Sequence, residues 1–289
     1  MYGSINCCVQ GIQEQYIPEE RYVAEEREFG DEDSEAAADK FVELVKNASK
    51  IAIFSGAGVS TESNLPAYRT VGAQDNIWDK NSESDGHINN FINNPESRKR
   101  YWRMHLDFAK LIAKAEPNPA HLIATYLQES GKLLGVVTQN IDGLYLKAGI
   151  EPSKLIELHG YCREIACMTC GFIVDYPSVY EMWEKDEDII CPTCGGLLKP
   201  KTVSFGQALD PDTLQKATNI HKNCDLLIVM ASSLVVQPAN QLPGYALSNN
   251  VPLIICNIGE TKYDEYATVL FNNQYVGTLS QNILNKLKL

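Results

Sequence analysis

The sequence predicts an α/β fold, built on an open parallel sheet with helices on both faces. Short continuous apolar runs suit strands that are buried on both sides of such a sheet. Four such runs stand at 51–54, 133–137, 226–230 and 252–256. Helical patterns separate them, and this alternation is typical of a Rossmann-like sheet. Two stretches break the rhythm and are expected to be insertions.

Capping residues help to place the helices in order along the chain. Ser34 is expected to cap a first helix whose apolar face includes Phe41 and Val45. Asn118 and Pro119 are typical of an N-cap and a first helical residue, and open a helix that runs to about residue 130. Later elements are expected as helices at 211–223, 238–249 and 279–288 and a last strand near Tyr275–Val276.

The charge is concentrated at the amino terminus. The chain of 289 residues carries a net charge of −12, and residues 1–40 hold 11 acidic and 3 basic side chains. The remainder is only mildly acidic, which argues against a large contact with a phosphate backbone and hence against nucleic acid. Residues 1–34 are expected to be a disordered, solvated extension, although an arm that attracts basic substrates is an alternative.

Two further properties concern the compartment. No apolar run approaches the roughly 20 residues of a membrane-spanning helix, and the first residues lack a secretory pattern. Nine cysteines with no sign of secretion favour a reducing compartment. We therefore expect a cytoplasmic protein, with the nucleus and mitochondrion left open. Cys224 and Cys256 lie in or beside apolar runs and are expected to be buried.

Four of the cysteines form two C-x-x-C pairs. Cys167 and Cys170 are followed twenty residues later by Cys191 and Cys194. Two such pairs supply the four thiolates of a tetrahedral zinc, and glycines after each pair favour tight turns. The spacing predicts one structural zinc. A redox-active pair is the weaker alternative, because there are two pairs and no βαβ context.

The stretch GAGVSTESNLPAYR follows the first apolar run and begins like a dinucleotide-binding turn. Gly56 and Gly58 allow backbone N–H groups to approach a phosphate, and a helix that starts near Ser60 adds its positive end. Thr61 stands where a dehydrogenase fingerprint has its third glycine, which disfavours that class. Arg69 offers a fork of donors to phosphate or ribose oxygens. A bare structural turn is the competing interpretation.

Three more motifs occur in order along the chain. TQNIDGL at 138–144 and ASSLVVQP at 231–238 each follow an apolar run, so both are expected at the carboxyl edge of the sheet, where ligands bind. ELHG at 157–160 precedes the first cysteine pair. Together with the glycine loop and the cysteines, this ordered set resembles the sirtuin family of NAD-dependent protein deacylases over about residues 35–289. RKRYW and PNPAH resemble its class II group.

Several positions depart from the pattern of that family. Ala67 stands where an acidic residue is usual, Ala231 where a glycine is usual, and Gln207 where a glutamate is usual. The Tyr-x-x-Arg pair that reads acidic acyl groups in another subgroup is not reproduced, since Tyr101 is followed by Met104. That motif therefore gives no support for a succinyl or malonyl preference.

The resemblance implies a site for NAD and for an acyl-lysine protein or peptide. The implied catalytic residues are His159, Asn140 and Asp142. The implied NAD contacts lie in loops that follow strands, and they are Gly56, Ala57, Gly58, Thr61, Tyr68, Arg69, Gln139, Asn140, Ile141, Asp142, Ala231, Ser232, Ser233, Asn257, Ile258 and Gly259. Val203, Phe205 and Gly206 are implied to offer an edge to which the peptide adds as a strand. Turn formation, loop capping and an ordinary buried strand are the structural alternatives.

The implied reaction transfers the acyl group from lysine to ADP-ribose and releases nicotinamide. His159 is implied to be the base that activates a ribose hydroxyl, because imidazole titrates near working pH. Asn140 is implied to hold a ribose hydroxyl or water, and Asp142 the amide of nicotinamide. The alternatives are a protein ADP-ribosyltransferase, which expels nicotinamide with the same residues, and a non-catalytic NAD or zinc scaffold.

These inferences divide the chain into parts. Residues 35–289 are expected to be one catalytic domain, whose oligomeric state the sequence leaves open. Its sheet domain is expected from 35–71, 117–160 and 201–289, its helical insertion from 72–116 and its zinc module from 161–200.

Overall fold

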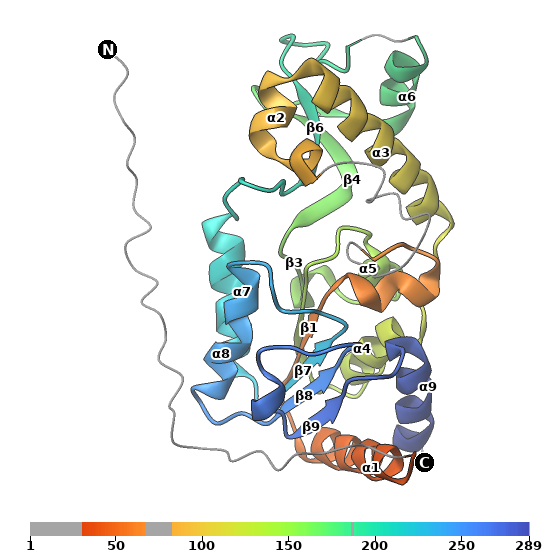
Figure 1. Ribbon diagram of the computed structural model, residues 1–289, viewed down its shortest axis with the longest axis vertical. Coiled ribbons are helices and arrows are strands. Elements are labelled where there is room, and N and C mark those ends of the chain that lie inside the picture. Colours follow the sequence, from red (N-terminus) through yellow and green to blue (C-terminus); the bar gives the residue numbers. More distant parts are fainter. Residues whose placement is uncertain (1–30, 68–82, 186–187, 289) are drawn as a thin grey trace.

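The computed structural model describes residues 31–67, 83–185 and 188–288, with side chains from Ser34 onward. A six-stranded parallel sheet runs through the lower lobe of the molecule, as Figure 1 shows. Its order is β3-β2-β1-β7-β8-β9. The strands are β1 (Ile51–Ser55), β2 (Leu133–Thr138), β3 (Leu155–Glu157), β7 (Leu226–Met230), β8 (Leu253–Cys256) and β9 (Val269–Phe271).

The order of the strands places a topological switch between β1 and β7. β1 pairs in parallel with β2 on one side and with β7 on the other, so the chain leaves β1 in one direction and later returns to its opposite edge. Open α/β sheets bind ligands at such a point, outside the carboxyl ends of the strands. The predicted α/β fold with an open parallel sheet is confirmed.

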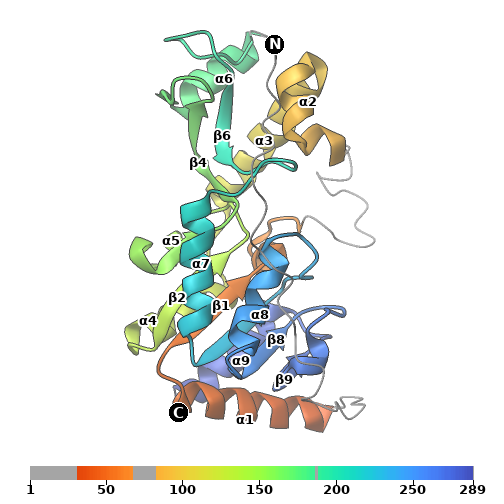
Figure 2. The same ribbon diagram turned by 90° about the vertical axis from the view of Figure 1, so that its left-hand side faces the viewer.

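Helices cover both faces of this sheet (Figures 1 and 2). One face packs against α1 (Asp31–Asn47), α4 (Pro119–Glu129) and α9 (Val276–Leu287). The other packs against α7 (Pro211–Asn223) and α8 (Leu242–Leu247). Successive side chains of a strand point to opposite faces. Every residue of β1 is therefore buried, with Ile53 in the first core and Phe54 in the second.

The two predicted insertions pack together into one upper lobe (Figure 2). Phe91 and Trp102 from the helical insertion share a core with Ile165 and Leu198 from the cysteine-containing segment. This lobe contains α2 (Ile88–Asn93), α3 (Pro95–Lys114), α6 (Tyr176–Glu184) and an antiparallel sheet of β5 (Ile173–Val174), β4 (Gly160–Cys167) and β6 (Leu198–Thr202).

Short elements connect these parts. The helix of one turn is α5 (Leu144–Lys147), and the 3-10 helices are η1 (Ala57–Ser63), η2 (Glu83–Gly86), η3 (Pro152–Lys154), η4 (Ala239–Gln241) and η5 (Asp264–Tyr266). Within the described part of the chain, no helix combines the length and the apolar character that crossing a membrane requires.

The structure corrects three local predictions. Ser34 lies inside α1 and not at its N-cap, because the helix already begins at Asp31. Tyr275 is the N-cap of α9, so the last strand is not at Tyr275–Val276 but at Val269–Phe271, which pairs with β8. The helix expected from Ser60 is instead a 3-10 helix that begins at Ala57, directly after the glycine turn.

Candidate active site and zinc centre

The glycine turn lies directly against the loop that follows β7. The Gly56 N–H donates to the Met230 carbonyl at 3.0 Å. A Cβ on Gly56 would lie 2.6 Å from the Ala231 carbonyl oxygen, and one on Gly58 would lie 2.9 Å from the Ala231 Cβ. Real Cβ atoms do not approach so closely, so both positions need glycine. The Thr61 hydroxyl closes the turn by donating to the Gly58 carbonyl at 2.8 Å.

Ser60 connects two of the predicted catalytic residues. Its buried hydroxyl donates to Asp142 Oδ2 at 2.7 Å and accepts from Asn140 Nδ2 at 3.1 Å. Sequence reasoning used Ser60 only as the start of a helix and missed this role. A hydroxyl in the loop was the available signal, but the partner residues are about eighty positions away.

The Asp142 carboxyl lies in an environment that disfavours its charge. Burial raises its pKa above the ordinary value, while hydrogen bonds from the Leu144 N–H and the Ser60 hydroxyl oppose that rise. Asn140 is also buried, and among the described residues its Oδ1 has no hydrogen-bond partner. A buried acceptor without a partner is costly unless a ligand or water completes it.

His159 is oriented by a backbone carbonyl. Its Nδ1 lies 3.1 Å from the Gln139 carbonyl oxygen, which only accepts, so Nδ1 carries the proton. In the neutral ring, Nε2 then has a free lone pair. Burial lowers the pKa of His159 below its usual range, which favours that neutral form. The arrangement is suited to general-base catalysis.

The loops after β2 and β7 are joined by side chains. Gln139 Nε2 donates to the buried Ser232 hydroxyl at 2.8 Å, and that hydroxyl also accepts from the Leu234 N–H. Ser233 is exposed, and Ala231 takes a φ of 48°. Ile141 contributes its carbonyl to the Cys162 N–H at 2.9 Å. Five predicted NAD contacts therefore lie on loops that touch one another at the topological switch.

The third predicted loop follows β8. Asn257 is buried, and its Nδ2 donates to the carbonyls of Ile258 and Gly259 at 3.2 and 2.9 Å, as loop capping requires. The Ile258 side chain is exposed, and Gly259 takes a φ of 86°. Tyr68 and Arg69 lie outside the described residues.

The predicted peptide edge is partly paired within the chain. The Val203 N–H donates to the His159 carbonyl at 2.8 Å. The Phe205 N–H donates to the Gly86 carbonyl at 3.2 Å, and the Phe205 carbonyl accepts from the Ile88 N–H at 2.9 Å. Among the described residues, the Gly206 N–H and carbonyl have no hydrogen-bond partner. Within the described part of the chain, Gly206 is the residue of this run whose N–H and carbonyl are both left for another chain.

The four predicted zinc ligands converge at one end of the upper lobe. The sulfur atoms of Cys167, Cys170, Cys191 and Cys194 all lie within 4.8 Å of one another. The Cys167–Cys194 and Cys170–Cys191 pairs are 3.5 and 3.7 Å apart. A tetrahedral zinc with sulfur at about 2.3 Å requires sulfur pairs at about 3.8 Å. The geometry fits a closed structural zinc site.

The loops at the switch also fit NAD. The glycine turn lies close to the loop after β7, and its glycines, which lack side chains, let backbone N–H groups approach a phosphate. Asn140 Oδ1, which has no partner among the described residues, offers an acceptor to a ligand. Residues of three loops would hold the dinucleotide. Those after β1 and β7 suit phosphates, and the loop after β2 suits the nicotinamide end.

Comparison with known proteins gives matches over most of the chain. The Sir2 family model matches residues 56–238. A Streptomyces coelicolor protein described as NAD-dependent protein deacetylase 2 is 39% identical over 220 residues, which are 75% of this chain and 89% of that protein. A Caldanaerobacter subterraneus protein of the same description is 37% identical over 258 residues, or 89% and 98% of the two chains.

Solved structures agree with these relatives. A Sir2–p53 peptide–NAD+ complex has a TM-score of 0.75 and 32% identity, and covers 86% of this chain and 97% of its own. A Sir2 protein bound to acetylated peptide has a TM-score of 0.76 and 31% identity, with the same coverage.

Proposed function

Because the chain belongs to the Sir2 family and is an NAD-dependent protein-lysine deacylase, we propose that the loops at the switch between β1 and β7 form its active site. The observation that carries this proposal is the hydrogen-bonded set of Asn140, Ser60 and Asp142 beside an oriented His159. Bound NAD supplies the bond to nicotinamide that is cleaved and the ribose hydroxyl that accepts the acyl group.

The Asp142 carboxyl and Ser60 hydroxyl are proposed to fix the leaving nicotinamide. Because the Ser60 hydroxyl donates a hydrogen bond to Asp142, its oxygen is the acceptor for Asn140 Nδ2. The other amide atom, Asn140 Oδ1, therefore takes no part in the hydrogen bond with Ser60. Oδ1 is then proposed to accept from a ribose hydroxyl or a water. The chain thus holds both ends of the reacting unit from neighbouring loops, which lowers the entropic cost of reaching the reactive geometry.

His159 is proposed to take the proton of the ribose hydroxyl at Nε2. The hydrogen bond from Nδ1 to the Gln139 carbonyl keeps Nε2 as the basic atom and stabilises the imidazolium that forms. The His159 carbonyl also accepts from the Val203 N–H, so the base and the proposed peptide edge are linked by one backbone contact.

The proposed partner is an acyl-lysine peptide that pairs with the main chain at Gly206. Its unpaired N–H and carbonyl among the described residues support this docking point, and strand addition needs such groups. Neither a nucleic-acid partner nor an oligomer is part of the proposal. A reducing compartment such as the cytoplasm suits four cysteines that bind zinc as thiolates.

The test is incubation of the protein with NAD and acyl-lysine peptides, followed by mass spectrometry. We expect deacylated peptide, nicotinamide and O-acyl-ADP-ribose.

His159→Ala should reduce kcat by about 10²–10⁴-fold while NAD binding persists, since it removes the base. Ser60→Ala should reduce kcat about tenfold, whereas Ser248→Ala, at an exposed serine in α8's C-cap, should not. ADP-ribosylated protein without deacylation would support the transferase alternative instead.

The pH profile gives a second measurement of the same base. Only neutral His159 can accept a proton, so kcat/KM should be constant above the pKa of His159 and fall as pH drops through it. Because burial lowers that pKa, the fall should lie below about pH 6.5, the ordinary value of histidine. A fall centred well above pH 7 contradicts the assignment of His159 as the base.

A further inference from the structure

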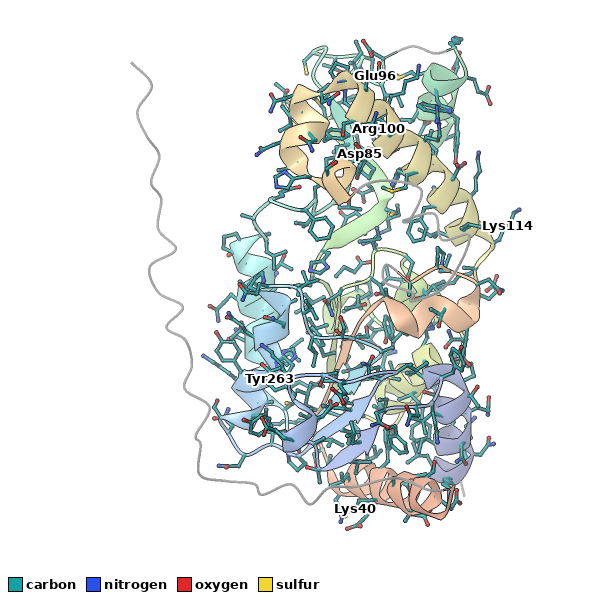
Figure 3. All side chains as sticks on the ribbon, in the orientation of Figure 1. Lys40, Asp85, Glu96, Arg100, Lys114 and Tyr263 are labelled. Atoms are coloured by element: carbon teal, nitrogen blue, oxygen red, sulfur yellow. The ribbon has the colours of Figure 1, made fainter. Side chains whose placement is uncertain are left out.

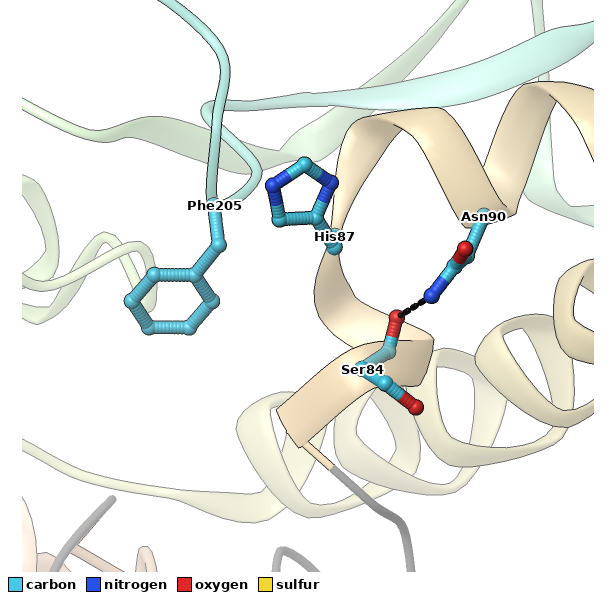
Figure 4. Close-up of a pocket in the computed structure, with 4 residues that line it drawn as sticks. All are labelled: Ser84, His87, Asn90 and Phe205. Atoms are coloured by element: carbon cyan, nitrogen blue, oxygen red, sulfur yellow. Dashed lines mark hydrogen bonds between the residues drawn. The ribbon is translucent and has the colours of Figure 1, made fainter.

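A cavity of about 320 Å³ lies where the start of α2 meets the run after β6. Its lining includes Ser84, His87, Asn90 and Phe205, which Figure 4 shows around one opening. The volume is at the low end of the range of about 300–1,000 Å³ for ligand sites. It suits one large side chain and is too small for a dinucleotide.

The walls of this cavity are tied to one another by main-chain hydrogen bonds. His87 and Phe205 form a parallel bridge, in which the Phe205 N–H donates to the Gly86 carbonyl and the Ile88 N–H donates to the Phe205 carbonyl. The Phe205 ring packs on Gly86, where an added Cβ would lie 3.5 Å from it, and its side chain is still 41% exposed. One aromatic wall is therefore held in place and open to solvent.

The 3-10 turn below the cavity is also anchored. The buried Asp85 carboxylate accepts two hydrogen bonds from the Arg100 guanidinium, both 2.8 Å, and one from the Ser97 hydroxyl at 2.6 Å. Figure 3 labels Asp85 and Arg100 at this place in the upper lobe. Asn90 Nδ2 donates to the Ser84 carbonyl at 2.7 Å. The cavity is thus largely formed before anything binds.

His87 points a donor toward the predicted peptide edge. Its Nδ1 accepts from the Asn89 N–H at 3.3 Å, so the neutral ring carries its proton on Nε2. A Cβ on Gly206 would lie 2.4 Å from that Nε2. The imidazole therefore occupies the space that the missing side chain of Gly206 leaves, beside a residue whose main-chain N–H and carbonyl have no hydrogen-bond partner among the described residues.

We propose that this cavity is a subsite for an uncharged aromatic side chain of the substrate, on a residue that flanks the acyl-lysine. The inference rests on the proposed function, because it needs a peptide strand at Gly206. None of its described lining residues is a lysine, arginine, aspartate or glutamate, so these described walls offer no counter-charge to a charged side chain. Phe205 and His87 offer ring contacts, and Nε2–H offers a donor to a tyrosine hydroxyl.

The test is deacylation of acetyl-lysine peptides that carry alanine, tyrosine or aspartate at each of the two positions on either side of the lysine. Wild-type protein should prefer tyrosine to alanine at one position by about tenfold in kcat/KM. His87→Ala and Asn90→Ala should bring that ratio close to one. Asn93→Ala is the matched control, since Asn93 also donates to a backbone carbonyl of this segment but does not line the cavity.

Peptide affinities from calorimetry, measured on the same series, separate the two proposals. A tyrosine preference that survives both variants overturns the subsite and leaves the proposed chemistry standing. A tyrosine preference in Kd that His87→Ala removes supports the subsite even where no peptide is deacylated, and then only the proposed chemistry fails. Absence of a preference in both Kd and turnover overturns the subsite.

Discussion

The two lobes of this molecule are stabilised in different ways. In the sheet lobe, β1, β7 and β8 are buried along their whole length, and helices cover both faces. In the upper lobe, β5 has two residues, and the apolar side chains of Phe172 and Ile173 are nearly half exposed. A small core of this kind needs an additional cross-link, and the four cysteines provide one through zinc.

We propose separate tasks for the two lobes. The loops that fit NAD all follow strands of the sheet lobe, whereas β6 and the proposed peptide edge belong to the upper lobe. In this proposal the sheet lobe positions the reacting groups of the cofactor, and the upper lobe positions the substrate. Loss of the metal is then expected to impair peptide binding before NAD binding.

The largest expected effect comes from breaking the zinc site. Cys170→Ala should release zinc, because it removes one of four ligands, and unfold β4–β6 while the sheet remains folded. Zinc binding contributes about 10–16 kcal/mol in isolated zinc-finger peptides, and most of this is folding free energy. Hydrogen exchange should rise across 160–202 and stay low in β7 and β8. Metal analysis gives the stoichiometry, about one zinc per chain in the unmodified protein.

Cys224→Ala is the control for that experiment. Cys224 is buried in the sheet lobe and is not among the four clustered cysteines, so this variant should keep its zinc and the protection of β4. Equal loss of protection in both lobes of Cys170→Ala would show that they fold as one cooperative unit and contradict the separation.

A smaller effect is expected from filling the space at the glycine turn. Gly56→Ala places a Cβ 2.6 Å from the Ala231 carbonyl, and this oxygen belongs to the backbone and cannot rotate away. Overpacking of this kind costs about 1–3 kcal/mol, and here it should also separate the two loops that we propose to face the phosphates. The KM for NAD should rise more than the KM for peptide. Gly244→Ala in α8 should be tolerated, since its nearest neighbour would lie at 3.5 Å.

The sequence predicted the sheet better than the contacts between loops. Apolar runs predict strands such as β7, because a strand that is buried on both faces needs apolar residues at every position. The family resemblance implied His159, Asn140 and Asp142 as a catalytic set, and the structure shows them on the loops that follow β2 and β3. The role of Ser60 could not be predicted, because its bonds to residues 140 and 142 arise only when β1 and β2 pair.

Two other features were beyond the reach of local patterns. β9 has only three residues, Val269–Phe271, and derives its stability from pairing with β8, so its apolar signal is too short to recognise. The common core of the two insertions contains both Trp102 and Leu198. These residues are almost a hundred positions apart, so a local sequence pattern cannot predict that they pack together. The cavity beside His87 depends on the same packing of the insertions.

The smallest expected effect tests the sheet lobe at its edge. Lys132 Nζ donates to the carbonyls of Val45, Lys46 and Ala48 at 3.1, 2.8 and 2.6 Å, and so caps the carboxyl end of α1. These carbonyls otherwise lack helical partners, and a cation there also compensates the helix dipole. Lys132→Met keeps an unbranched side chain that is one heavy atom shorter and removes the donor. We expect a loss of about 1 kcal/mol in the free energy of unfolding.

The matched control for this variant is Lys46→Met, because Lys46 lies in the same last turn but its side chain is exposed. Chemical denaturation monitored by far-ultraviolet circular dichroism compares the two proteins under identical salt. Equal stabilities would mean that Lys132 acts only as a surface charge. A loss confined to Lys132→Met, with the protection of β4 unchanged, shows that α1 belongs energetically to the sheet lobe and that the zinc lobe does not sense it.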